Sequence, residues 1–132
     1  MTAAPLVSVL VPTHDRPETV VRAVRGWRGQ RLAGAGEAPA LEVVVVVDGA
    51  APATVGALAA AAGDDPLVAV HPQAHAGPAE ARNRALDHAR GRYVLFADDD
   101  VVPADEGVVA RWLARAAAGG AWAARMTVPD EL

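Results

Sequence analysis

The sequence contains no cysteine and very few aromatic residues. The absence of cysteine among its 132 residues excludes disulfide bonds and thiolate metal sites. Aromatic side chains make up 4% of the residues, whereas hydrophobic residues make up 52%. The chain therefore has the composition of a folded globular protein, and its core must be built mainly from small and β-branched side chains. Its length predicts a single domain over residues 1–132.

The sequence also lacks an excess of positive charge and a long apolar segment. Lysine and arginine number 12 against 16 acidic residues, and the arginines are scattered, so we expect no nucleic-acid partner. No apolar run reaches the ~20 residues that a membrane-spanning helix needs, and no basic segment at the start of the chain indicates a signal peptide. We expect a cytoplasmic protein, whether free or attached peripherally to a membrane.

Short valine-rich segments alternate with helical patterns along the chain. Residues 43–47 are consecutive valines, and a run that is apolar on both faces is typical of an interior strand of a parallel sheet. The predicted strands are 6–11, 41–47, 67–71, 92–97 and 121–128. The predicted helices are a segment that opens at 16–19 and includes Trp27, the segments 54–62 and 77–89, and a helix within residues 103–118. This alternation predicts an α/β fold, a three-layer α/β/α sandwich with a mostly parallel sheet.

Individual residues predict where some of these elements begin and end. Pro12 is expected to end the first strand. Asp15 or Thr13 is expected to cap the first helix, in which Pro17 suits the first turn. Asp105 is expected to cap the last helix.

Polar residues concentrate where the predicted strands end, and ligands bind beyond the carboxyl ends of the strands in sheets of this kind. Those ends carry residues 12–16, Asp48 with Gly49, residues 71–77 and the aspartate run 98–100. Neither a Walker phosphate loop nor a G-x-G-x-x-G pattern occurs, and His71 and His75 lack the spacing of a helical zinc pair. The sequence therefore predicts a functional site of another kind at this edge of the sheet.

Asp98, Asp99 and Asp100 form the sharpest feature of the sequence. Adjacent carboxylates repel one another, and a bound cation would relieve that cost. Hard oxygen ligands favour Mg²⁺ or Mn²⁺, and Mg²⁺ is usually held by one or two carboxylates together with substrate phosphates. In an extended segment Asp98 and Asp100 point the same way, so this pair could address one diphosphate and its metal. The alternative is a solvated loop whose aspartates cap turns and the next helix.

Other polar residues have both a structural and a functional interpretation. Asp48 with Gly49 is typical of a turn, or else the Asp48 carboxylate accepts from the imide N–H of a uracil or from a ribose hydroxyl. His14 and Arg16 are loop residues that could contact a base or a phosphate. Arg82, in a predicted helix, could bind a diphosphate or lie solvated on the surface. The residues alone leave these alternatives open.

Four segments resemble family 2 glycosyltransferases and occur in the order and spacing of that family. They are similar to its first strand and loop, its second strand with an acidic turn, the helix before its metal strand, and that strand with its DxD motif. The segments are 7–17 (VSVLVPTHDRP), 45–49 (VVVDG), 77–86 (GPAEARNRAL) and 91–100 (GRYVLFADDD). The resemblance covers nearly the whole chain and implies the GT-A fold of nucleotide-diphospho-sugar transferases, truncated relative to the family.

The resemblance implies a metal-dependent, inverting glycosyltransferase with a nucleotide-diphosphate sugar donor, often UDP-linked, and an unknown glycan, lipid or small-molecule acceptor. The residues that it assigns to the nucleotide sugar are Pro12, Thr13, His14, Asp48, Arg82, Asp98 and Asp99. Asp48 would contact the base or the ribose. Asp98 and Asp100 would hold the metal, Mg²⁺ or Mn²⁺, and Asp99 is an alternative to either.

The sequence departs from the family pattern at the second-strand turn and in its length. The turn commonly has two acids followed by Gly-Ser, whereas here Val47 precedes Asp48 and Ala50 follows Gly49. Family members continue past this point, into a part that supplies acceptor contacts and the catalytic base. A binding module that needs another segment for catalysis is thus an alternative. A nucleotidyltransferase is a third, disfavoured because no Gly-rich basic loop follows the first strand.

Absence of the part that family members have beyond this point would have a physical consequence. It would leave apolar surface exposed near residues 112–122, which include Trp112 and Trp122. We therefore expect marginal stability or self-association.

Overall fold

The computed structural model describes residues 4–32, 40–49, 51–116 and 119. Strands and helices alternate along these residues, as the sequence predicts. The strands are β1 (Val7–Thr13), β2 (Leu41–Asp48), β3 (Val68–Gln73) and β4 (Tyr93–Phe96). The helices are α1 (Pro17–Arg28), α2 (Pro52–Ala62), α3 (Pro78–His88) and α4 (Val108–Ala116).

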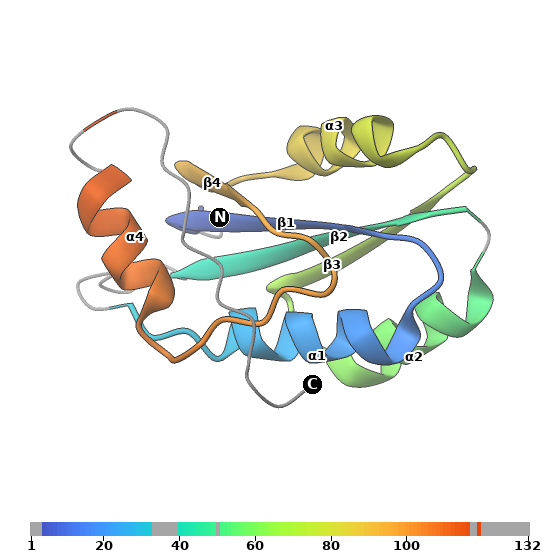
Figure 1. Ribbon diagram of the computed structural model, residues 1–132, viewed down its shortest axis with the longest axis horizontal. Coiled ribbons are helices and arrows are strands. Elements are labelled where there is room, and N and C mark those ends of the chain that lie inside the picture. Colours follow the sequence, from blue (N-terminus) through green and yellow to red (C-terminus); the bar gives the residue numbers. More distant parts are fainter. Residues whose placement is uncertain (1–3, 33–39, 50, 117–118, 120–132) are drawn as a thin grey trace.

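The four strands form one parallel sheet in the order β3-β2-β1-β4. β1 and β2 lie at its centre, paired from Val7 opposite Leu41 to Thr13 opposite Val47, and every residue of β2 is buried. Helix α3 covers one face of the sheet, and α1 and α2 cover the other (Figure 1). The predicted three-layer sandwich with a parallel sheet is therefore confirmed.

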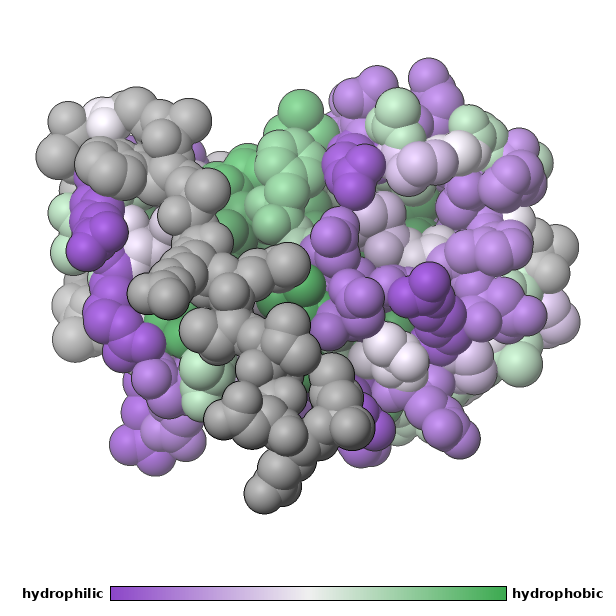
Figure 2. Space-filling view, viewed as in Figure 1, coloured by the Kyte–Doolittle hydropathy of each residue, from purple (hydrophilic) through white to green (hydrophobic). Residues whose placement is uncertain are grey.

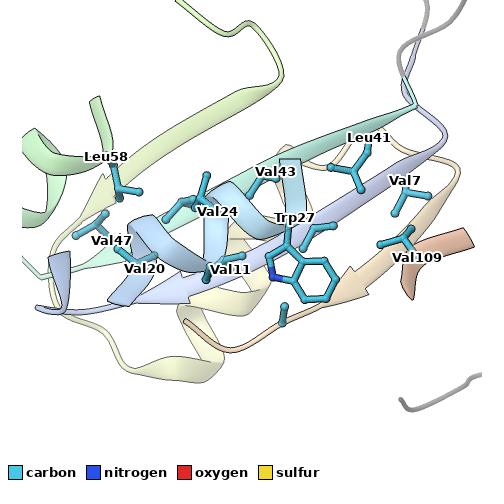
Figure 3. Packing of buried hydrophobic residues seen from close by; sticks show 14 of the residues in the cluster. Val7, Val11, Val20, Val24, Trp27, Leu41, Val43, Val47, Leu58 and Val109 are labelled. Carbon is cyan, nitrogen blue, oxygen red and sulfur yellow. The ribbon is translucent and has the colours of Figure 1, made fainter. Parts of the chain in front are cut away.

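Two hydrophobic clusters join the helices to the sheet. On the face covered by α1 and α2, Trp27 is 4% exposed and packs among the valines of β1 and β2 (Figure 3). On the opposite face, Leu10 and Val44 lie in one cluster with Ala81 and Ala85 of α3. The small alanine side chains let α3 lie close to the sheet, which places the start of this helix over the strand ends.

The prediction that Pro12 ends the first strand is wrong, because β1 continues to Thr13. β4 runs beside β1 only as far as Phe96, which lies opposite Leu10. Beyond that point β1 has β2 on one side and no described strand on the other. A proline is tolerated at such an edge position, since its missing N–H removes no ladder hydrogen bond on the open side.

The predicted caps of α1 are also wrong. Arg16 occupies the N-cap position, and no side chain caps the helix. The hydroxyl of Thr13 bonds to the aspartate run described below, and the carboxylate of Asp15 accepts from the Thr54 hydroxyl over 3.3 Å. Pro17 does occupy the first turn, where its fixed φ suits the helix.

Helix α4 lies within the segment 103–118 that the sequence predicts to contain a helix, but it begins at Val108, later than a cap at Asp105 would place it. Asp105 does not cap it. The Asp105 carboxylate accepts from the Gly107 N–H over 2.8 Å and from the Arg111 guanidinium over 2.9 Å, which stabilises a turn ahead of the helix. The predicted strand 121–128 lies outside the described residues.

Within the region 112–122, where the sequence predicts exposed apolar surface, the structure describes residues 112–116 and 119. Trp112 is partly buried and meets the Tyr93 ring edge-on, with ring centroids 6.5 Å apart. The large hydrophobic side chains exposed among the described residues are Leu86, Phe96 and Val102. Trp122 lies outside the described residues, so self-association stays a prediction. None of the described helices has both the length and the apolar character required to cross a membrane.

Candidate functional site

A pocket of about 420 Å³ opens at the carboxyl ends of the strands, where the sequence predicts a site. That volume is within the range of small-molecule sites. The pocket is lined by Pro12, Thr13, His14, Arg16, Asp48, His75, Pro78, Ala81, Arg82, Asp98, Asp99 and Asp100. Every residue that the sequence assigns to the site is among them. Polar residues predominate over this side of the molecule, on the right in Figure 2.

The aspartate run after β4 forms a turn rather than an extended segment. The N–H of Val101 donates to the carbonyl of Asp98 over 3.2 Å. The side chain of Asp99 is 13% exposed, and it accepts from the Thr13 hydroxyl over 2.8 Å. The side chains of Asp98 and Asp100 are 61% and 59% exposed. Asp98 and Asp100 therefore face solvent together, while Asp99 is turned toward β1.

Two arginines supply counter-charges to this run. Arg82 Nη2 lies 3.3 Å from Asp98 Oδ1. Arg16 Nη1 lies 3.5 Å from Asp99 Oδ1 and 3.9 Å from Asp100 Oδ2. The pairs that involve Asp98 and Asp100 are exposed on both sides and contribute at most about 1 kcal/mol each. A ligand can therefore separate the arginines from the carboxylates at little cost.

The charge of the pocket suits a divalent cation. Four aspartates and two arginines line it, so negative charge is in excess. No group of three His, Cys, Asp or Glu side chains within the described part of the chain could hold a metal alone. Mg²⁺ commonly takes one or two carboxylates and completes its shell with substrate phosphates and water. The two exposed carboxylates of Asp98 and Asp100 fit such a shared site for Mg²⁺ or Mn²⁺.

Asp48, at the end of β2, is held by the chain itself and is 7% exposed. Its Oδ1 accepts from the Gln73 side chain over 3.1 Å and from the Ala76 N–H over 2.8 Å. Its Oδ2 accepts from the Gly77 N–H over 3.0 Å and lies 3.1 Å from His75 Nδ1. Burial raises the pKa of Asp48, but these hydrogen bonds outweigh it and hold the pKa below its ordinary value. The carboxylate therefore stays ionised at neutral pH.

Two histidines stand beside Asp48 on the pocket wall. The rings of His14 and His75 have centroids 5.4 Å apart and are tilted by 55°. His14 Nδ1 bonds to the main-chain carbonyl of Asp48, and since a carbonyl only accepts, Nδ1 carries the proton. Gly49 has φ 95°, and a Cβ there would lie 3.0 Å from His14 Cε1. Glycine at this turn thus makes room for the His14 ring.

The pocket also includes Arg16, His75, Pro78 and Ala81. Arg16 lies in the loop 12–16, and the sequence left open whether it contacts a base or a phosphate. His75 lies in the strand-end segment 71–77, but no sequence signal assigned it, Pro78 or Ala81 to the site. It meets Asp48 because β2 and β3 are neighbours, with Asp48 opposite Gln73, and that pairing is a property of the sheet.

Comparisons with known proteins agree with the fold and the motifs. The model of Glycosyl transferase family 2 matches residues 8–131. The succinoglycan biosynthesis protein ExoO of Rhizobium meliloti (strain 1021) is 37% identical over 118 residues. That match covers 89% of this chain and 31% of ExoO, so the chain spans about a third of that relative.

Two solved structures are similar to this chain. One is the mannosyltransferase PcManGT of Pyrobaculum calidifontis, in complex with GDP-Man and Mn²⁺. Its TM-score is 0.69 and its sequence identity is 28%. The match covers 88% of this chain and 33% of that one. The other is TarS of S. aureus, with a TM-score of 0.59 and 28% identity over 72% of this chain and 16% of that one. These proteins therefore contain large parts with no counterpart here.

Proposed function

Because the chain belongs to glycosyltransferase family 2 and has its GT-A fold, we propose that the strand-end pocket binds a nucleotide-diphosphate sugar together with a divalent metal. One observation carries the proposal: the residues assigned from sequence, which come from β1, β2, α3 and the turn after β4, all line one pocket. A turn-capping role for the aspartates would not require them to share a cavity with His14 and Arg82.

We assign the two ends of the pocket to different parts of the donor. Asp98 and Asp100 hold Mg²⁺ or Mn²⁺ at the diphosphate end, with Asp99 as the alternative ligand. Arg82 turns from Asp98 to the diphosphate, for which its guanidinium geometry is suited. Pro12, Thr13 and His14 border the nucleoside together with Asp48. A UDP-linked donor is our expectation from sequence, and GDP-mannose is the ligand of the similar mannosyltransferase, so both need testing.

The proposed reaction is an inverting displacement at the anomeric carbon. An acceptor hydroxyl oxygen bonds to that carbon while the bond to the diphosphate oxygen breaks, and the hydroxyl proton passes to a base. A bound divalent metal supplies stabilisation of the departing diphosphate. The described residues provide the leaving-group half of this reaction, and none of them is assigned as the base. The acceptor, a cytoplasmic or membrane-peripheral location and self-association remain proposals.

A second function is favoured by the extent of the chain. Because it spans about a third of ExoO, the chain could bind the donor and depend on another segment for catalysis. Donor binding and sugar transfer must therefore be measured separately.

Calorimetric titration of UDP, UDP-sugars and GDP-mannose in the presence of Mn²⁺ tests the proposal. We expect binding that requires the metal and weakens about 100-fold in Asp100→Ala, since contacts to charged groups contribute up to about 3 kcal/mol. Asp105→Ala is the matched control, because Asp105 pairs with Arg111 and does not line the pocket. Absence of binding by the wild type, or equal effects of the two substitutions, would reject the proposed donor site.

A further inference from the structure

Residues 101–107 connect the aspartate run to α4 without a helix or strand of their own. We call this segment the strap. It follows directly on Asp100, which the proposed function assigns to the metal, and its first residue, Val101, packs against the hydrophobic cluster under α1. The strap passes along α1 toward the end of that helix (Figure 1). The contacts that fix the strap therefore also fix where the aspartate run ends.

The middle of the strap lies directly against α1 at Gly26. A Cβ at this position would lie 2.8 Å from Pro103 Cδ and 3.2 Å from Val102 Cγ1. Carbon atoms in contact are ordinarily about 3.5–4.0 Å apart, and a proline ring cannot turn aside as a flexible side chain can. Glycine weakens a helix interior relative to alanine. Its presence at residue 26 is explained by the close approach of the strap.

Gln30, just beyond α1, holds the far end of the strap with both atoms of its amide. Nε2 donates to the main-chain carbonyl of Asp105 over 2.6 Å, and Oε1 accepts from the Val109 N–H over 3.0 Å. Val109 lies in the first turn of α4, where main-chain N–H groups have no partner within the helix. The Asp105 carboxylate takes no part in this anchor, because it faces Gly107 and Arg111.

Two further contacts show that α1 follows the aspartate run and the strap in the same order along the chain. At the start of α1, Arg16 Nη1 lies 3.5 Å from Asp99 Oδ1. Beyond its end, the Arg31 N–H donates to the main-chain carbonyl of Glu106 over 2.8 Å. One helix therefore supports this part of the chain from the pocket to the start of α4.

We propose that the strap, anchored on α1 by Gly26 and Gln30, holds the aspartate run in the turn that presents Asp98 and Asp100 to the metal. Gly26 and Gln30 are then positioning residues of the metal site. This inference rests on the proposed function, since it assumes a metal at these carboxylates. Residues that orient metal ligands without touching the metal commonly change metal affinity by about 10–100-fold.

The experiment measures Mn²⁺ binding in the presence of UDP or GDP, whichever the wild type binds, from the EPR signal of free Mn²⁺. We expect the Kd for Mn²⁺ to rise about tenfold in Gln30→Ala and in Gly26→Ala. In Gly26→Ala the loss cannot come from a weaker helix, because alanine is the better helix former. Ser8→Ala is the matched control: it removes the buried hydrogen bond to Glu42 at the other end of the sheet and should leave the Kd unchanged.

Gln30→Glu separates positioning from helix capping. An ionised glutamate keeps an acceptor for the Val109 N–H but cannot donate to the Asp105 carbonyl. If Gln30 only capped α4, glutamate would replace it, since negative charge is favourable at a helix N-terminus. We expect the urea midpoint to recover relative to Gln30→Ala while the Kd for Mn²⁺ stays about tenfold above the wild-type value. The added negative charge would favour a cation, so weaker binding must come from the geometry of the site.

Three results would overturn the proposal. The first is an unchanged Kd for Mn²⁺ in Gln30→Ala or in a folded Gly26→Ala. The second is a wild-type Kd in Gln30→Glu, which would assign Gln30 to capping alone. The third is a loss in Ser8→Ala as large as in Gln30→Ala, which would show that general destabilisation weakens the site. If the wild type binds no Mn²⁺ with either nucleotide, the proposed donor site fails instead, and the role of the strap is decided without ligand.

The ligand-free test is hydrogen exchange of the Val101 amide, measured by NMR. This amide donates to the Asp98 carbonyl and therefore reports the aspartate turn itself. We expect faster exchange in Gln30→Ala and Gly26→Ala, and wild-type exchange in Ser8→Ala, because amides in a turn exchange through local opening. Val101 exchange that neither strap variant alters would contradict the role, whatever the pocket binds.

Discussion

The two ends of the sheet carry carboxylates that are held in opposite ways. At the amino end, Glu42 is 4% exposed and accepts from the Ser8 hydroxyl (2.6 Å), the Arg90 N–H (2.8 Å) and Arg90 Nε (3.0 Å). At the carboxyl end, Asp98 and Asp100 are more than half exposed and face only arginine side chains. The difference teaches that location at a strand end does not make a carboxylate functional; what matters is whether the chain has already satisfied its oxygens.

The amino end is also sterically closed. The Ser8 hydroxyl, which donates to Glu42, accepts from the Gly91 N–H over 2.7 Å. A Cβ at residue 91 would lie 2.5 Å from the Ser8 main-chain nitrogen, so only glycine fits against β1 there. This cluster leaves no room for a ligand, in contrast to the open pocket at the other end.

Removing the buried carboxylate at the amino end should have the largest effect on stability. We expect Glu42→Ala to lower the free energy of unfolding by about 3 kcal/mol or more, because the buried Ser8 hydroxyl and the Arg90 N–H lose their acceptor. Urea denaturation measures the change. Glu80→Ala, at an exposed position in the first turn of α3, is the control and should cost no more than about 1 kcal/mol. Equal losses of unfolding free energy in the two variants would show that the buried Glu42 carboxylate stabilises the fold no more than the exposed Glu80 does.

Asp65, ahead of β3, is a second carboxylate at the amino end of the sheet. The pH dependence of its contribution to stability extends the comparison. The hydrogen bond from Arg28 lowers the pKa of Asp65 more than burial raises it, and the Leu67 N–H lowers it further. Its stabilisation is therefore complete above about pH 3.9, the ordinary aspartate value, and is lost as pH falls through the lower folded value.

We expect Asp65→Asn to cost about 1 kcal/mol at neutral pH and progressively less in acid, as the wild-type carboxyl also becomes neutral. Unfolding in urea at neutral pH and near pH 2 provides the measurement. A cost that is the same at both pH values would mean that the charge of Asp65 does not matter.

Neutralising an aspartate at the open end should have the smallest effect on stability. Asp100 is 59% exposed and lies 3.9 Å from its nearest arginine, so we expect Asp100→Asn to change the free energy of unfolding by less than about 0.5 kcal/mol. The measurement is urea denaturation with a chelator present. A loss above about 1 kcal/mol would favour the alternative that the aspartate run is a structural turn cap.

The fold and the membership of the pocket could be predicted because both follow from local patterns. Alternating valine-rich and helical segments give the layers, and the polar residues that end each strand meet at one edge. The partners of those residues could not be predicted. His75 reaches Asp48 because β3 lies beside β2, and Arg90 reaches Glu42 although β1 lies between β2 and β4, so both contacts depend on the arrangement of the sheet. The start of α4 was missed because Asp105 caps a turn as readily as a helix.

The valines of β2 raise a question of alignment that its two acidic residues answer. Residues 43–47 are identical side chains, all fully buried, so sliding β2 by one position would still set a valine against nearly every partner on β1 and β3. Hydrophobic burial alone hardly distinguishes the observed register of β2 from one that is shifted by a single residue. The carboxylates of Glu42 and Asp48, one near each end of β2, meet their hydrogen-bond donors in only one register of the strand. A slip by a single residue would leave both carboxylates buried without partners, so these two residues make an otherwise repetitive strand unique in its placement.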